Sequence, residues 1–128
     1  MSYYISRMLH VSFDQAVERV KDELKKEGFG VLTEIDVKET LKKKLDVEFP
    51  RYRILGACNP PFAYQALQAE DKIGVLLPCN VIVRETSEAN VEVAVIDPLV
   101  SMQAVANPRL KDTATKVQAK LKAVIAAL

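Results

Sequence analysis

The sequence predicts a single α+β domain, 1–128, with a mostly antiparallel sheet and helices packed on one of its faces. Apolar residues recur at helical spacing near both ends of the chain, whereas the middle holds several short runs rich in β-branched residues. The predicted order is strand, helix, strand, helix, strand, helix, strand, strand, helix, which leaves α/β as the alternative class. A chain of 128 residues is long enough to bury one hydrophobic core.

Composition excludes several classes of protein. Lys and Arg number 18 against 17 acidic residues, so the basic excess that is typical of nucleic-acid binders is absent. We find no signal peptide and no apolar run of the ~18–20 residues that cross a membrane, so we expect no membrane partner and a cytoplasmic location. Two cysteines in a reducing compartment are expected as free thiols, and a single histidine argues against a conventional zinc site.

The first helix has the clearest signals at both of its ends. It follows a predicted strand, Tyr3–Leu9, and spans Phe13–Glu27. Ser12 is a good N-cap with Gln15 at the capping-box position, and Gly28 is a typical residue just past a helix end. The spacing predicts an apolar stripe of Phe13, Ala16, Val17, Val20 and Leu24.

A second strand is predicted at Phe29–Val37. Strict alternation would put Val31, Thr33, Ile35 and Val37 on one face, and Leu32, Glu34 and Asp36 on the other. The two carboxylates would then lie roughly 7 Å apart on one face. A short helix, Lys38–Leu45, follows, and its lysines at 42–44 indicate a solvated surface.

The longest apolar run, Ile73–Arg84, is predicted as two strand halves that meet at Cys79-Asn80. Pro78 cannot donate a ladder hydrogen bond, so it implies a bend, a bulge or a strand edge. The preceding strand, Tyr52–Asn59, ends in a second Cys-Asn pair, and Pro60-Pro61 begins the next helix, whose predicted buried side is Phe62, Ala66 and Ala69.

The C-terminal part is predicted as a hairpin followed by helix. A polar loop, Glu85–Asn90, leads into a strand, Val91–Val95, that pairs with the region of Ile82. Asp97-Pro98 opens a helical turn, and Asn107-Pro108 starts the final helix. The predicted apolar stripe of that helix is Leu110, Ala114, Val117, Leu121, Val124 and Leu128.

Two Cys-Asn pairs, Cys58-Asn59 and Cys79-Asn80, carry the best chemical signal. A thiol at a strand end or break can act as a nucleophile, a redox group or a soft metal ligand, but free cysteine is also a common core residue. Both alternatives stay open for each cysteine. Because one helix returns the chain between the two pairs, we expect both cysteines to lie close together.

Carboxylates form the second candidate set. Glu34 and Asp36 suit a general base or a metal ligand, or simply a solvated strand side. For Asp97 we favour helix capping over catalysis, and for His10 a structural role. The sequence contains no glycine-rich phosphate loop, and it identifies no catalytic residue, cofactor or metal.

Several of these segments together resemble the domain-of-unknown-function family 302 (DUF302). The resemblance rests on the segments at 28–36, 40–45, 52–60, 73–83 and 95–98, above all on Cys58-Asn-Pro and Pro78-Cys-Asn behind Glu34-Ile-Asp36. It implies a small α+β domain that tends to form homodimers, with no established activity. It also implies the signature positions Glu34, Asp36, Lys44, Cys58, Asn59, Pro78, Cys79, Asn80 and Asp97.

Three functional hypotheses follow. The first is a homodimeric domain that binds a small polar ligand or a metal ion at Cys58, Asn59, Cys79 and Asn80, with Glu34 and Asp36 nearby and Lys44 and Asp97 as further candidates. The second is a thiol-dependent enzyme or redox protein that uses Cys58 or Cys79. The third is a protein-interaction scaffold. The charges expected near the thiols are mostly carboxylates, and negative neighbours and burial both raise the pKa of a thiol, so we expect neither thiol to be unusually acidic.

Overall fold

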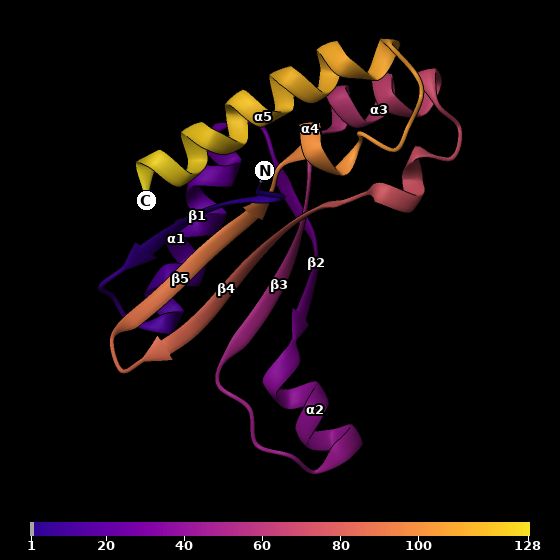
Figure 1. The fold of residues 1–128 in the computed structure, drawn as a ribbon. Helices are drawn as coiled ribbons and strands as arrows, with labels where there is room; N and C mark the ends of the chain where they lie inside the picture. The colour runs from indigo at the N-terminus through magenta and orange to yellow at the C-terminus, as the bar shows by residue number, and fades with distance from the viewer. Residues whose placement is uncertain (1) are drawn as a thin grey trace.

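The computed structural model describes residues 2–128 and contains one five-stranded sheet in the order β1-β5-β4-β3-β2 (Figure 1). Every neighbouring pair of strands is antiparallel, which confirms the predicted α+β class. No helix within residues 2–128 has the length and apolar character that crossing a membrane requires. The strands are β1 Tyr4–Leu9, β2 Gly30–Asp36, β3 Tyr52–Cys58, β4 Cys79–Ser87 and β5 Asn90–Ile96. The helices are α1 Phe13–Lys26, α2 Val37–Leu45, α3 Pro60–Ala69, the 3₁₀ helix η1 Ile73–Leu76, α4 Pro98–Ser101 and α5 Arg109–Ala127.

One face of the sheet and two helices, α1 and α5, build the main core. The central strands β4 and β5 supply a row of valines in which Val81 pairs with Val95 and Val83 with Val93. Burial of an apolar side chain of this size contributes roughly 1.5–3 kcal/mol relative to exposure. The helices cover this row with their apolar stripes, so helices and sheet stabilise one another.

Helix α1 confirms its sequence signals in detail. Ser12 and Gln15 form the predicted capping box, and all five residues of the predicted apolar stripe are buried. Gly28 follows the helix with a φ of +86°, a conformation that favours glycine.

Strand β2 departs from the strict alternation that the sequence predicted. A bulge lies between Val31 and Thr33, so Val31 and Glu34 share the core side of the sheet while Thr33 faces the other side. The extra residue, Leu32, shifts the pleat, as a β-bulge does. Val37, predicted as the last residue of the strand, instead begins α2.

The central apolar run is not two strand halves, and this prediction is wrong. Residues Ile73–Leu76 form η1, and the strand begins only at Cys79, after a cis peptide bond between Leu77 and Pro78. Pro78 lies over Gly56 of β3, where the β-carbon of any larger residue would approach the proline Cγ to 2.8 Å and would overlap Thr33 Oγ1. A glycine is therefore required at this position for the close approach.

The C-terminal hairpin and helices follow the prediction with small shifts. Strand β4 extends to Ser87, so the polar loop between β4 and β5 is shorter than predicted. The carboxylate of Asp97 caps α4 by accepting from Leu99 N–H, and Asn107 Oδ1 accepts from Arg109 N–H at the start of α5. Five of the six residues in the predicted stripe of the last helix are buried, and the remaining one, Leu128, is half-buried.

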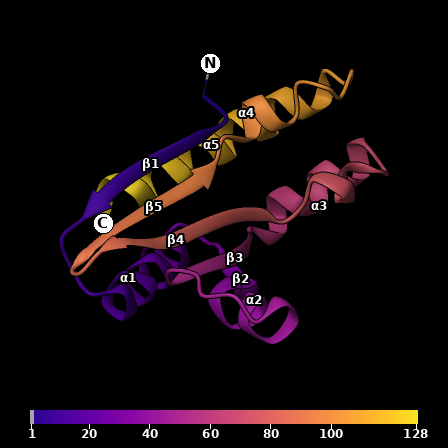
Figure 2. The ribbon, with the colours of Figure 1, turned by 60° about the horizontal axis from the view of Figure 1, so that its bottom comes forward.

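Two parts of the chain extend past the ends of the sheet. Helix α3, η1 and the N-terminal half of α5 lie beyond the same end of the strands, whereas α2 projects from the opposite end (Figures 1 and 2). A second, smaller apolar cluster of Ala66, Ile73 and Leu110 joins α3, η1 and α5. Between this cluster and the main core the chain leaves an open space, which is the candidate site.

Candidate functional site

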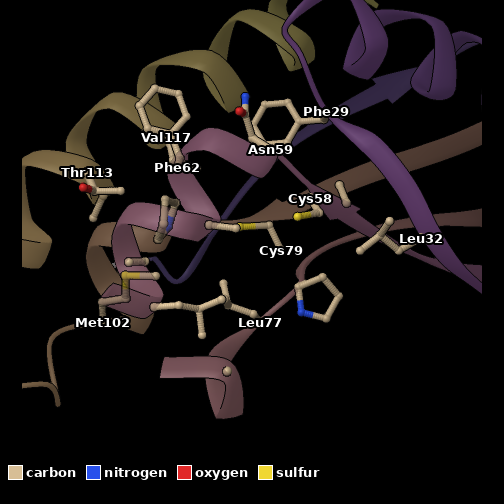
Figure 3. Close-up of a pocket in the computed structure, with 18 residues that line it drawn as sticks. Phe29, Leu32, Cys58, Asn59, Phe62, Leu77, Cys79, Met102, Thr113 and Val117 are labelled. Carbon is tan, nitrogen blue, oxygen red and sulfur yellow. The ribbon is translucent and has the colours of Figure 1, made fainter. Parts of the chain in front are cut away.

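The candidate site is a cavity of about 350 Å³ that lies where β3 ends and β4 begins (Figure 3). Its walls come from α3, η1, the start of α4 and one side of α5. Apart from the two thiols, only Asn59 and Thr113 contribute polar side chains, and no charged side chain lines it. The lining residues are Phe29, Leu32, Ala57, Cys58, Asn59, Phe62, Ala63, Ala66, Leu67, Gly74, Leu77, Pro78, Cys79, Pro98, Met102, Thr113, Ala114 and Val117.

Both cysteines line this cavity, which confirms the prediction that they lie close together. Cys79 is the first residue of β4 and pairs with Ala57, the residue that precedes Cys58 on β3. The two thiols are free, with Cys79 buried and Cys58 half-buried. Neighbouring strands thus bring both sulfur atoms to one cavity without a disulfide.

The Cys79 thiol is held in its neutral form. Burial, and to a lesser degree the neighbouring Cys58, raises the pKa of Cys79 from 9.0 to about 11. The direction agrees with our expectation from the sequence, which gave burial and carboxylate neighbours as the two causes; burial is the main one, and no carboxylate lines the cavity. At neutral pH very little Cys79 thiolate is present to act as a nucleophile.

Asn59 lines the cavity but uses its amide for structure. Its Nδ2 donates to the backbone carbonyl of Glu27 at 3.1 Å, and the residue is only 8% exposed. This bond ties the end of β3 to the end of α1. The adjacent Gly28 leaves room for it, since a side-chain carbon there would lie 3.2 Å from Nδ2.

The two carboxylates of β2 do not line the cavity. Glu34 accepts from Lys21 and Arg53, each at 2.9 Å, and the hydrogen bond from Lys21 is the main reason that its pKa lies below 4.5. Asp36 instead caps α2 by accepting from Glu39 N–H at 2.9 Å. The single pocket predicted from Cys-Asn and Glu-Asp residues therefore does not form, because cross-strand ion pairing holds Glu34 and capping holds Asp36.

The remaining candidates also lie outside the cavity. Asn80 points to the other face of the sheet from Cys79, as alternation along β4 requires. Asp97 accepts two hydrogen bonds from Gln118 Nε2, each at 3.1 Å, in addition to capping α4, which confirms the capping interpretation. Lys44 is exposed on α2. His10 follows the last residue of β1 and pairs through Nδ1 with Asn90 Oδ1 at 2.6 Å.

Sequence reasoning missed the helical walls of the cavity. Phe62 and Ala66 were predicted to be buried, but their spacing does not reveal whether they pack against a core or line a cavity. Nothing in the sequence marked Met102 or Thr113 as residues that line a cavity. Within residues 2–128 no group of three or more His, Cys, Asp or Glu side chains could hold a metal ion.

Comparison with known proteins identifies the family. A family model described as "Domain of unknown function DUF302" matches residues 5–128. The chain belongs to the DUF302 family. A crystal structure of an uncharacterized conserved DUF302 protein from Bacillus stearothermophilus is similar, with a TM-score of 0.90 and 27% identity over 98% of each chain. No curated protein matches the chain.

The bond from Asn59 to Glu27 generates a stability prediction. Asn59→Ala should lower the free energy of unfolding by about 1–3 kcal/mol, because the Glu27 carbonyl loses its donor. Asn59→Asp should cost at least as much, since a carboxylate cannot donate to a carbonyl. Urea unfolding of the two variants measures the effect. Asn80→Ala, at an exposed position of β4, is the control for the general effect of removing an asparagine amide.

The raised pKa of Cys79 generates a reactivity prediction. The rate at which iodoacetamide alkylates Cys79 should rise with pH toward a midpoint near 11, because only the thiolate reacts. Peptide mass spectrometry after timed quenching gives the rate for Cys79 separately from Cys58. A midpoint at or below the ~8.5 of a free thiol would contradict the buried, neutral thiol.

Proposed function

We propose that this protein is a small binding domain whose ligand occupies the cavity beside Cys58 and Cys79. The supporting observation is the lining of the cavity, which is almost entirely carbon and sulfur and lies where β3 ends and β4 begins. Well-formed apolar cavities with few polar groups are the usual form of small-molecule sites. The proposed ligand is a compact, uncharged molecule.

This ligand class differs from the polar ligand that we expected from the sequence. Burying a charged or strongly polar group without a partner costs several kcal/mol, roughly 2–7 for an amide or hydroxyl. In the cavity one N–H of the Asn59 amide already donates to Glu27, so the rest of that amide and the Thr113 hydroxyl are the few side-chain partners for a polar ligand. An apolar ligand needs no hydrogen-bond partner.

The thiol-enzyme alternative receives less support. A nucleophilic cysteine needs a populated thiolate, usually stabilised by a cation or a base. The cavity brings no charged side chain to Cys79, and burial keeps its thiol protonated. Free thiols at both positions fit a reducing compartment, so a cytoplasmic location is part of the proposal.

We also propose that the protein is a homodimer that pairs through the open face of its sheet, defined here by Tyr4, Met8, Ile35, Ile54, Ile82 and Ile96. Helices α1 and α5 cover the opposite face. Tyr4, Met8 and Ile35 are 44%, 45% and 47% exposed, which is high for apolar side chains of a sheet. Exposed apolar side chains that gather on one face are typical of protein interfaces, and the Arg84–Glu92 ion pair lies on the same face. A second copy is the partner that the family resemblance implies.

Filling the cavity should abolish binding of an apolar probe. N-phenyl-1-naphthylamine, an uncharged fluorescent compound, should bind the wild type with a rise in fluorescence. Ala63→Phe on α3 puts a ring into the cavity and should weaken binding at least about tenfold, a loss of ~1.4 kcal/mol. The control is Ala123→Phe, the same change at an exposed position of α5. Equal binding by both variants, or none by the wild type, would contradict the proposal.

A charge in the centre of the open face should separate the dimer. Light scattering of the wild type should give a mass near twice the 14.3 kDa of the chain. Ile82→Lys should give the monomer mass, because pairing would bury an unpaired ammonium group. Val75→Lys, at an 85% exposed position of η1, should remain dimeric. A monomeric wild type at micromolar concentration refutes this proposal.

A further inference from the structure

Sulfur is concentrated at the cavity. The chain has two cysteines and three methionines, and both cysteines and one methionine line this one space. Cys58 and Cys79 approach from neighbouring strands β3 and β4, while Met102 approaches from the end of α4. Figure 3 shows the three side chains entering the cavity from these elements.

The other groups in the cavity do not suit a hard metal ion. Magnesium and calcium require several oxygen ligands, and no carboxylate lines the cavity. Within residues 2–128 no group of three or more His, Cys, Asp or Glu side chains could hold a metal ion, so the four ligands of a structural zinc site are not assembled. Thiolate and thioether ligands select soft ions, of which Cu(I) is the main biological example.

We propose that Cys58, Cys79 and Met102 form a binding site for a soft monovalent metal ion of the Cu(I) class. The proposal uses the same cavity as the proposed function but does not require an organic ligand. On binding, metal–sulfur bonds replace the S–H bonds of the cysteines that ligate, and each released proton leaves to solvent. The thioether of Met102 donates a lone pair without losing a proton. Copper stays Cu(I) throughout, so no electron is transferred.

Chelator competition tests the site directly. The full-length, reduced protein is titrated without oxygen against the Cu(I) complex of bathocuproine disulfonate, whose colour reports the copper that remains on the chelator. The wild type should remove one Cu(I) per chain. Cys58→Ala and Cys79→Ala should each lower the affinity at least about a hundredfold, and Met102→Leu about three- to tenfold.

Met8→Leu is the matched control for the thioether. Met8 is 45% exposed on the open face of the sheet and does not line the cavity, and leucine keeps that face apolar, so this variant should bind Cu(I) as the wild type does. Circular dichroism of each variant checks that it is folded. Should a cysteine variant unfold, Met102→Leu against Met8→Leu still decides whether the metal lies in this cavity.

Several results would overturn the metal proposal. These are a wild type that fails to take Cu(I) from the chelator, equal affinities for Met102→Leu and Met8→Leu, or retained affinity in a folded cysteine variant. Zn(II), titrated in parallel, should bind more weakly, and a preference for Zn(II) also overturns the proposal. Loss of Cu(I) binding with intact binding of N-phenyl-1-naphthylamine would leave the proposed function in place, so the two failures are distinguishable.

Discussion

The contact between the valine-rich face of β4–β5 and helices α1 and α5 is the interaction on which the rest of the structure depends. Val81, Val83, Val91 and Val93 are fully buried there, together with Leu121 of α5. Because each strand is long enough to carry two or three inward residues under the helices, the contact fixes the sheet register and the helix positions together. Arg7 adds to it by donating to the carbonyls of Ile125 and Ala126 at the end of α5.

This packing cannot extend past the ends of the strands, and the cavity is the consequence. Helix α3, η1 and the first turns of α5 pack on one another through Ala66, Ile73 and Leu110, and they form a cluster apart from the main core. Small side chains, such as Ala57, Ala63 and Ala114, face the space between the two clusters. Larger residues would close that space and gain stability, since cavities cost roughly 24 cal/mol per Å³. An apolar cavity can accept an apolar guest.

The sequence was sufficient where one local signal decides the outcome. The cap at Ser12 and the 3.6-residue spacing of α1 determine that helix, and Cys58-Asn59 correctly marked the end of β3. It was insufficient where two structures share one pattern. Ile73-Gly-Val-Leu76 suits a buried strand as well as a 3₁₀ turn, and only the packing against α3 and α5 decides between them. The bulge at Leu32 also gives no signal in the sequence, and it places Val31 on the same face of β2 as Glu34, against strict alternation.

Alternation along the strands explains why only some of the candidate residues line the cavity. Neighbouring residues of a strand point to opposite faces, so Cys79 and Asn80 cannot both enter one cavity within β4. This rule does not keep Cys58 out of the cavity, because β3 ends at Cys58 and the chain then turns into α3, which forms part of the cavity wall.

The charged side chains of the molecule lie outside the cavity, so the lining offers a ligand only neutral groups. Lys21 and Arg53, cations on α1 and β3, are paired with Glu34 on the core side of β2. They are therefore not directed at the thiols, and burial is the main cause of the neutral state of Cys79. A site that keeps a buried thiol protonated and lacks a base is poorly suited to acid–base catalysis. It is well suited to a guest that needs no charge from the protein, or to a soft cation that displaces the thiol protons itself. Both proposals for the cavity thus follow from one property, the exclusion of charged side chains from the place where β3 ends and β4 begins.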